Sequence, residues 1–182
     1  MTLTPEVTEG PFYLDLNDVR RDITEGRPGA PLDLKISVID ATKCTPIEGA
    51  AVDIWHCDAS GVYSGFGQGG QTTFLRGTQL TDASGVAQFA TIFPGFYQGR
   101  AVHIHMKVHA GGSVVHTGQL FFDPTVTKAV FQSAPYSSRG TTPDTPNTGD
   151  SIFTQAGAAS AVVDTATSES GYAGQITVAV RP

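Results

Sequence analysis

Two histidines, His103 and His105, stand one residue apart in the segment AVHIHMKVH. Because side chains alternate between the two faces of a β-strand, a strand here would point both imidazoles the same way. Two imidazoles on one face form a good platform for a metal ion, since neutral imidazole is a common metal ligand. The alternative is that both rings are ordinary polar side chains on the surface of a sheet.

Two tyrosines extend this pattern. Tyr97 lies six residues before His103, in the turn that leads into the strand, and Tyr63 follows the turn Asp58–Gly61. Two phenolate oxygens and two imidazole nitrogens would form an anionic ligand set, and hard oxygen donors favour Fe(III) over Zn(II) or Cu(I). The alternative is that the tyrosine rings cover the edge of a core, as they do in turns of small β-sandwiches. The remaining histidines lie outside this candidate site.

The elements that would position these residues are short segments rich in Thr, Val, Ile and Phe between Leu32 and Phe122. Most alternate with a period of two residues, which is typical of strands. Turn signals such as DASG at Asp58–Gly61 and Asp82–Gly85 separate them. This spacing predicts an all-β fold, an antiparallel β-sandwich with long loops and at most one or two short helices. The predicted strands are LKISVID, AAVDIWHC, TQLTD, VAQFATI, AVHIHMKVH and VVHTGQLFF.

The ends of the chain have a different character. Residues 1–31 are rich in turns and predict an irregular N-terminal arm. The segment DPTVTKAVFQ predicts one short helix, capped by Asp123 with Pro124 at its first position. A long Pro/Ser/Thr/Gly loop follows from Ser133 to Asp150, and a loop of this length is functional or wraps the surface. Further strands are predicted at SIFTQA, AVVDTAT and YAGQITVAV. With no linker in view, residues 1–182 form one domain.

Composition excludes several classes of protein. The chain has 182 residues, 40% hydrophobic and 15% charged, which is typical of a globular domain. Eleven basic against 17 acidic residues give a formal charge of −6, which argues against nucleic acid as a partner. The sequence contains no apolar run of about 18 residues, so it predicts no membrane span. The opening residues MTLTPEVTEG lack the charged start and apolar stretch of a signal peptide.

The two cysteines, Cys44 and Cys57, sit at the outer ends of two predicted strands. If these strands were antiparallel neighbours, the thiols would come close enough to form a disulfide. A disulfide would indicate an oxidising compartment. The alternative is a pair of buried thiols.

The order of these motifs resembles the intradiol ring-cleavage dioxygenases, the non-haem Fe(III) catechol dioxygenases. The resemblance runs from TEGPFY to NTGDSIF and is strongest over residues 53–122. It rests on DIWHCDASGVYS, FLRGTQLTDASG, FATIFPGFYQGRAVHIH and TGQLFFD, where Tyr63, Tyr97 and the His-x-His pair keep the family order. The resemblance implies a prealbumin-like β-sandwich and non-haem Fe(III).

Residue roles follow from this resemblance. It implies that the metal ligands are Tyr63, Tyr97, His103 and His105. Tyr97 would leave the iron when substrate binds and act as a base. Arg100 would supply fixed positive charge to the bound catecholate, and Gln119 would hold Arg100 or His105 by hydrogen bonds. The residues that the resemblance places at the substrate pocket are Gly10, Pro11 and Tyr13, and Arg76 either lines the pocket rim or braces a loop.

The compact form, without a long helical dimerisation domain, resembles secreted members of the family. It implies an extracellular monomer whose partners are a catechol-type substrate and O₂, with no nucleic acid or membrane partner. The product would be a cis,cis-muconate-type diacid. A metal-free prealbumin-like sandwich that serves as a binding or interaction module is the main alternative. A histidine-and-carboxylate metalloenzyme is a weaker one, because no acidic residue follows His105 at a suitable distance.

Overall fold

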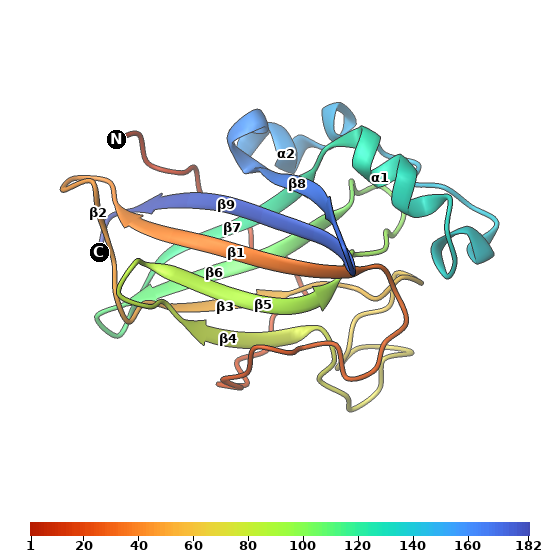
Figure 1. The fold of residues 1–182 in the computed structure, drawn as a ribbon, viewed down its shortest axis with the longest axis horizontal. Helices are drawn as coiled ribbons and strands as arrows, with labels where there is room; N and C mark the ends of the chain where they lie inside the picture. Colours follow the sequence, from red (N-terminus) through yellow and green to blue (C-terminus); the bar gives the residue numbers. More distant parts are fainter.

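A computed structural model describes all residues, 1–182, as a curled β-sheet folded into two packed layers with two short helices beside one end (Figure 1). One layer contains β4 (Arg76–Leu80), β3 (Ala51–Trp55), β6 (His103–Ala110) and β7 (Ser113–Phe122) in that order. The other contains β5 (Val86–Ile92), β1 (Pro31–Asp40), β9 (Gly171–Val180) and β8 (Val162–Ser168), and the two-residue β2 (Thr45–Pro46) pairs with β1. The predicted β-sandwich is therefore confirmed.

Two parallel pairings distinguish the sheet from a purely antiparallel one. β1 runs parallel to β9, and the end of β7 runs parallel to the start of β8. The second pairing joins the two layers, because β8 also pairs with β9. The space between the layers holds a core of 26 buried residues, among them Leu34, Ile36 and Ile104.

The helices are brief, and each follows a capping aspartate. α1 (Pro124–Phe131) is the predicted helix, and its Asp123 side chain accepts a hydrogen bond from the backbone N–H of Thr125. The predicted strand at SIFTQA is wrong, because Ser151–Gln155 forms the helix α2. Asp150 accepts from the N–H of Ile152 and so caps this helix. Neither helix is long and apolar enough to cross a membrane.

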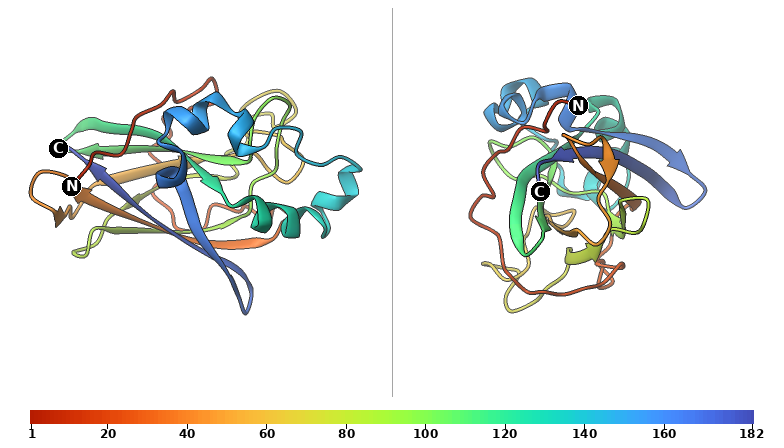
Figure 2. Two further views of the ribbon diagram at one scale, coloured as in Figure 1. Left: turned by 90° about the horizontal axis from the view of Figure 1, so that it is seen from above. Right: turned by 90° about the vertical axis from the view of Figure 1, so that its left-hand side faces the viewer.

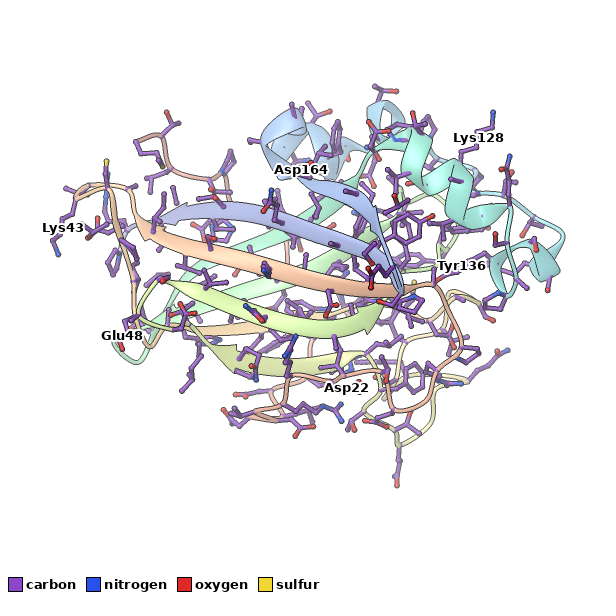
Figure 3. The ribbon with its side chains drawn as sticks, in the orientation of Figure 1. Asp22, Lys43, Glu48, Lys128, Tyr136 and Asp164 are labelled. Carbon is purple, nitrogen blue, oxygen red and sulfur yellow. The ribbon has the colours of Figure 1, made fainter.

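Short 3₁₀ turns carry the chain around the helices, at Tyr136–Arg139, Asn147–Gly149 and Ala158–Ala161. The buried Tyr136 lies at the end of the sandwich opposite to Lys43 (Figure 3). Its hydroxyl donates to the carbonyl of Phe93 at 2.5 Å and accepts from the N–H of Ala30 at 3.1 Å. The phenol thereby ties the segment after β5 to the start of β1.

The N-terminal arm crosses the outer face of the β4-β3-β6-β7 layer (Figure 2). It meets the strands in their spatial order. Val7 bonds to β7 through Thr117, Glu9 pairs with Lys107 of β6, and Tyr13 bonds to Asp53 of β3. Farther on, Arg20 bonds to the carbonyl of Thr78 in β4. The arm therefore buries side chains on a sheet face that would otherwise meet solvent.

The predicted disulfide between Cys44 and Cys57 is wrong, and both thiols are free. The reason is that β1 and β3 are not neighbours. β1 pairs with β2, β5 and β9 in one layer, whereas β3 pairs with β4 and β6 in the other. Cys44 is exposed next to Lys43, and Cys57 is buried against Trp55 and Tyr63 beyond the other end of β3.

The buried His56 predicts a dependence of stability on pH. Its Nδ1 lies 2.9 Å from the carbonyl of Cys57, and its Nε2 lies 2.8 Å from the hydroxyl of Thr91. Burial lowers the pKa of His56 from 6.5 to about 4. Between these values the unfolded chain binds a proton that the folded chain does not. The stability that neutral His56 contributes is therefore lost as pH falls from about 6.5 to about 4, by up to about 3 kcal/mol.

We expect His56→Gln to make this pH dependence shallower, by up to about 1.4 kcal/mol per pH unit. Urea unfolding curves at several pH values between 4 and 7 measure the effect. His109→Gln, on the outer face of β6, is the matched control. An unchanged slope in His56→Gln would contradict the assignment.

Candidate metal centre

The two predicted histidine ligands lie side by side on the outer face of β6. Ile104 and Met106 point into the core between the layers, so the alternating His103 and His105 point outward. Both rings are nevertheless buried, with 3% and 0% of their surface exposed. Trp55 stands directly opposite His105 on β3 and stacks on its ring at 5.1 Å and 6°. The strand pair and the arm together fix the two imidazoles.

The two tyrosines reach the same place from loops at one end of the sheet. Tyr63 follows a turn in which Asp58 accepts hydrogen bonds from the N–H groups of Ser60 and Val62. Tyr97 lies in the connection between β5 and β6, and it is more exposed than Tyr63, which is 4% exposed. Tertiary folding therefore unites one strand and two loops at a single point.

Four donor atoms meet there at contact distance. The Nε2 atoms of His103 and His105 are 3.1 Å apart. The Tyr63 hydroxyl lies 3.0 Å from His105 Nε2, and the Tyr97 hydroxyl lies 3.0 Å from His103 Nε2. Donor atoms that are each about 2 Å from one cation lie about 3 Å from one another, so the spacing fits a shared metal ion.

The protonation states also suit metal binding. His103 Nδ1 lies 2.6 Å from the carbonyl of Ala101, so Nδ1 carries the proton and Nε2 keeps its lone pair. Burial lowers the pKa of His103 to about 3 and that of His105 well below its usual value, which keeps both rings neutral. Burial also raises the pKa of Tyr63 and Tyr97 in the absence of a cation. The phenols then donate to the imidazoles, and a cation would replace those two protons.

No group of three or more His, Cys, Asp or Glu side chains is placed to hold a metal. The histidine-and-carboxylate alternative therefore has no ligand set in this fold. The tyrosine oxygens, each 3.0 Å from an imidazole Nε2, are the donors placed to complete a metal site with the histidine pair.

The predicted Arg100 and Gln119 are joined to each other beside the donor atoms. Arg100 Nη2 donates to Gln119 Oε1 at 2.5 Å, and the Gln119 amide donates to the carbonyl of Thr8 at 2.9 Å. Gln119 faces His105 across the β6–β7 pair. Of the two expected roles for Gln119, the structure shows the hydrogen bond to Arg100.

The predicted pocket residues divide into two kinds. Gly10 lies against the centre, and a Cβ there would be 3.1 Å from His105 Cε1. Its φ of +72° also favours glycine. Pro11 is exposed. Tyr13 turns aside and packs against Trp55 with ring centroids 4.9 Å apart and an interplanar angle of 56°, and its hydroxyl bonds to Asp53.

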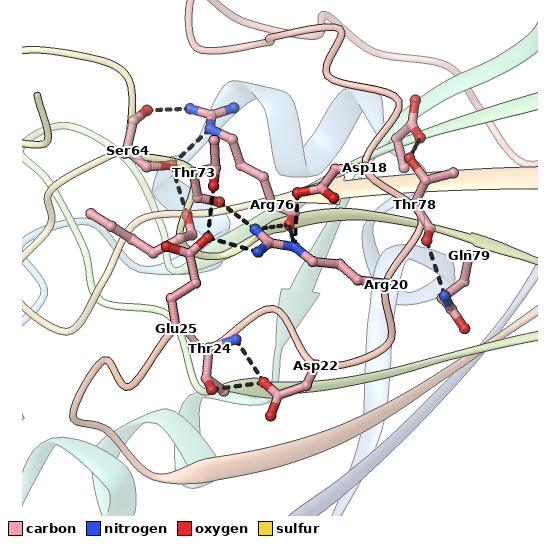
Figure 4. A network of polar contacts seen from close by, with 12 residues as sticks. Asp18, Arg20, Asp22, Thr24, Glu25, Ser64, Thr73, Arg76, Thr78 and Gln79 are labelled. Atoms are coloured by element: carbon pink, nitrogen blue, oxygen red, sulfur yellow. Dashed lines mark hydrogen bonds and ion pairs between the residues drawn. The ribbon is translucent and has the colours of Figure 1, made fainter. Parts of the chain in front are cut away.

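Arg76 braces a loop. Its guanidinium is buried and bonds to the hydroxyl and carbonyl of Ser64 and to the carbonyl of Phe12. Arg20 joins the same polar network by bonding to the carbonyls of Thr73 and Arg76 (Figure 4). The network ties the N-terminal arm to the loop that carries Tyr63.

Phe12, which the sequence alone does not single out, packs against both tyrosines of the candidate centre. Phe12 stacks on Tyr63 at 4.3 Å and meets Tyr97 edge-on at 6.0 Å, so it lies over the centre. The GPFY motif contains Phe12 but does not reveal its contacts. A cavity of about 470 Å³ lies over the outer face of β1 and β9, and a second, of about 440 Å³, lies beside α1. None of the four donor side chains lines either cavity.

The fold and these donors define a β-sandwich in which two tyrosines and two histidines meet on the outer face of one layer. Comparison with known proteins agrees with this class. The family model described as "Dioxygenase" matches residues 8–142. A solved intradiol ring-cleavage dioxygenase from Tetranychus urticae is 34% identical with a TM-score of 0.95, covering 100% of this chain and 96% of that one. The dioxygenase domain of a carbohydrate-binding fusion protein from Streptomyces sp. SirexAA-E is 28% identical with a TM-score of 0.77, covering 99% of each.

Curated relatives are longer than this chain. A chlorocatechol 1,2-dioxygenase of Cupriavidus pinatubonensis is 29% identical over 141 residues, which cover 66% of this chain and 54% of that enzyme. The chain thus spans about half the length of this curated relative. Together with the family model, these matches show that the chain belongs to the intradiol ring-cleavage dioxygenase family.

Proposed function

We propose that the protein is a non-haem Fe(III) enzyme that cleaves catechol-type aromatics with O₂ between the two hydroxyl-bearing carbons. The observation that carries this proposal is the meeting of two phenol oxygens and two imidazole nitrogens at 3.0–3.1 Å. Tyr63, Tyr97, His103 and His105 would hold the iron. When bound, Fe(III) would be chelated by the two adjacent oxygens of a catechol and would withdraw electron density from its ring.

The chain itself contributes a base. Tyr97 is more exposed than Tyr63, so a catechol that approaches from solvent would meet Tyr97 first. The Tyr97 oxygen takes a proton from one substrate hydroxyl, while the buried Tyr63 stays in place. This assignment separates the roles of two chemically identical side chains by their exposure.

Arg100 contributes fixed positive charge. Its side chain is 20% exposed and is held by hydrogen bonds to Gln119 and Asp150. A charge held rigidly in a site shielded from water stabilises negative charge that develops on the substrate. Phe12, lying over the donors, would exclude water from the same region.

The substrate class is supported by what the relatives are called. The similar enzymes include a chlorocatechol 1,2-dioxygenase of Cupriavidus pinatubonensis and a catechol 1,2-dioxygenase of Acinetobacter baylyi, 30% identical over 142 residues. Adjacent ring hydroxyls are the feature that these two names share. Secretion and a monomeric state stay predictions.

Product analysis with labelled oxygen tests the proposal. Iron-loaded protein is incubated with catechol under ¹⁸O₂. The expected product is cis,cis-muconic acid with both labelled oxygen atoms, which needs no external reductant. A yellow semialdehyde from cleavage beside the hydroxyls, or an unopened ring, would contradict the proposal.

Arg100→Ala tests the electrostatic role. We expect kcat to fall by about a hundredfold, because loss of one fixed charge-stabilising donor has an effect of about that size. Steady-state kinetics with catechol measure the change. Arg21→Ala is the matched control, since Arg21 pairs with Asp33 on the outer face of the other layer. Equal rates for the two variants would contradict the role.

A further inference from the structure

Asp150 is a buried carboxylate beside the candidate centre, and it is neither a candidate metal ligand nor the candidate base. Asp150 ends the long loop before α2 and is 3% exposed. Its Oδ2 accepts from Arg100 Nε at 2.8 Å and from the N–H of Ala101 at 3.0 Å. Its Oδ1 accepts from the N–H of Ile152 at 2.9 Å. The single carboxylate of Asp150 therefore accepts three hydrogen bonds, from Arg100, Ala101 and Ile152.

Two of these bonds lead to the candidate centre. Arg100 is held by Asp150 through Nε and by Gln119 through Nη2, so its guanidinium is fixed from two sides. The peptide of Ala101 is the second link. Its N–H bonds to Asp150, and its carbonyl accepts from His103 Nδ1 at 2.6 Å. Asp150 therefore supports Arg100 directly and His103 through the peptide of Ala101.

Helix capping alone does not explain this arrangement. Asp123 caps the longer α1 in the same way, yet it is exposed and pairs with no cation. Burial opposes the ionisation of Asp150, but the hydrogen bonds from Ala101 and Arg100 outweigh it and hold its pKa below the usual value. An ionised carboxylate buried without a cation would be costly, so the pairing with Arg100 is the distinctive feature.

We propose that Asp150 is a positioning residue of this site, which holds the Arg100 guanidinium in the orientation that substrate binding and turnover require. The proposal rests on the proposed dioxygenase function. Asp150 acts through Arg100 and touches neither substrate nor metal. The charge of Asp150 is needed for Arg100, whereas the N–H of Ala101 needs only an oxygen acceptor, which Asp150→Asn keeps. The effect of removing that charge must therefore disappear when Arg100 is absent.

A double-mutant cycle tests this dependence. Asp150→Asn keeps a side chain that caps helices well but removes the charge. In the presence of Arg100 we expect it to lower kcat/KM by about tenfold or more, the coupling typical of residues in one network. In the Arg100→Ala background we expect the same change to cost less than about twofold. Asp150→Glu, which keeps the charge, should recover part of the loss.

Asp123→Asn is the matched control, because it changes the other helix cap, and it should leave kcat/KM unchanged. Thermal unfolding of the metal-free variants measures their stability separately from catalysis. If Asp150 acts by positioning Arg100, the losses of stability among the variants should not parallel their losses of kcat/KM. In the metal-free protein, ¹H–¹⁵N spectra should show a protected Arg100 Nε–H that Asp150→Asn exposes to rapid exchange.

The outcomes separate the two proposals. Equal losses from Asp150→Asn with and without Arg100 would overturn the positioning role while leaving the dioxygenase function intact. An unchanged kcat/KM in Asp150→Asn would do the same. A wild-type protein that binds iron but does not open catechol would overturn both.

Discussion

Replacing His105 by glutamine is expected to abolish iron binding and, with it, ring cleavage. Its Nε2 lies 3.0 Å from the Tyr63 oxygen and 3.1 Å from His103 Nε2, so the change removes one of four donors. Loss of a hydrogen bond to a metal ligand lowers metal affinity about 10- to 100-fold, and loss of the ligand itself should exceed that range. Iron content after dialysis and the rate of catechol cleavage measure the two effects.

His109→Gln is the control for this change, because His109 lies on the same face of the same strand four residues later. It bonds to Asp53 at 3.0 Å and has no contact with the four donors. It should retain iron and activity. If His105→Gln kept both, the assignment of β6 as the metal-binding strand would be wrong.

Tyr97→Phe should separate metal binding from turnover. Three donors remain, including Tyr63, which is buried with Phe12 stacked on its ring. Tyr97 is also the ligand expected to leave the iron when substrate binds, so the variant loaded with excess Fe(III) should still bind catechol. We expect its kcat to fall by about 10²- to 10⁴-fold, the usual contribution of a positioned base. Iron content, visible absorption and steady-state kinetics of the same sample measure the result.

The control for Tyr97→Phe is Tyr172→Phe on β9, in the opposite layer. It should turn over catechol at the wild-type rate. Full turnover by Tyr97→Phe would remove Tyr97 as the base, whereas loss of all iron would make it an indispensable ligand.

The parts of the fold that sequence could predict are those with local causes. Period-two alternation placed His103 and His105 on one face of a strand, and the Asp123–Pro124 pair located α1. The family order of motifs brought Tyr63 and Tyr97 to the same site. These features depend on neighbours along the chain or on a shared motif, so they can be recognised without coordinates.

The parts that could not be predicted depend on which strands become neighbours. The expected disulfide failed because β1 and β3 belong to different layers. The segment SIFTQA carries strand-like Ile and Phe, but the cap from Asp150 makes it a helix. Asp150 lies 50 residues from Arg100, and no spacing rule connects them. The cover that Phe12 forms over Tyr63 depends likewise on the path of the arm.

The most direct test of the four-donor iron centre is the visible absorption spectrum of the iron-loaded protein, before and after catechol is added without oxygen. We expect a coloured protein, because tyrosinate bound to Fe(III) absorbs visible light. We also expect the band to move to longer wavelength when catecholate binds. A colourless protein that stays unchanged after ferric reconstitution would contradict the four-donor centre and leave the metal-free sandwich as the explanation.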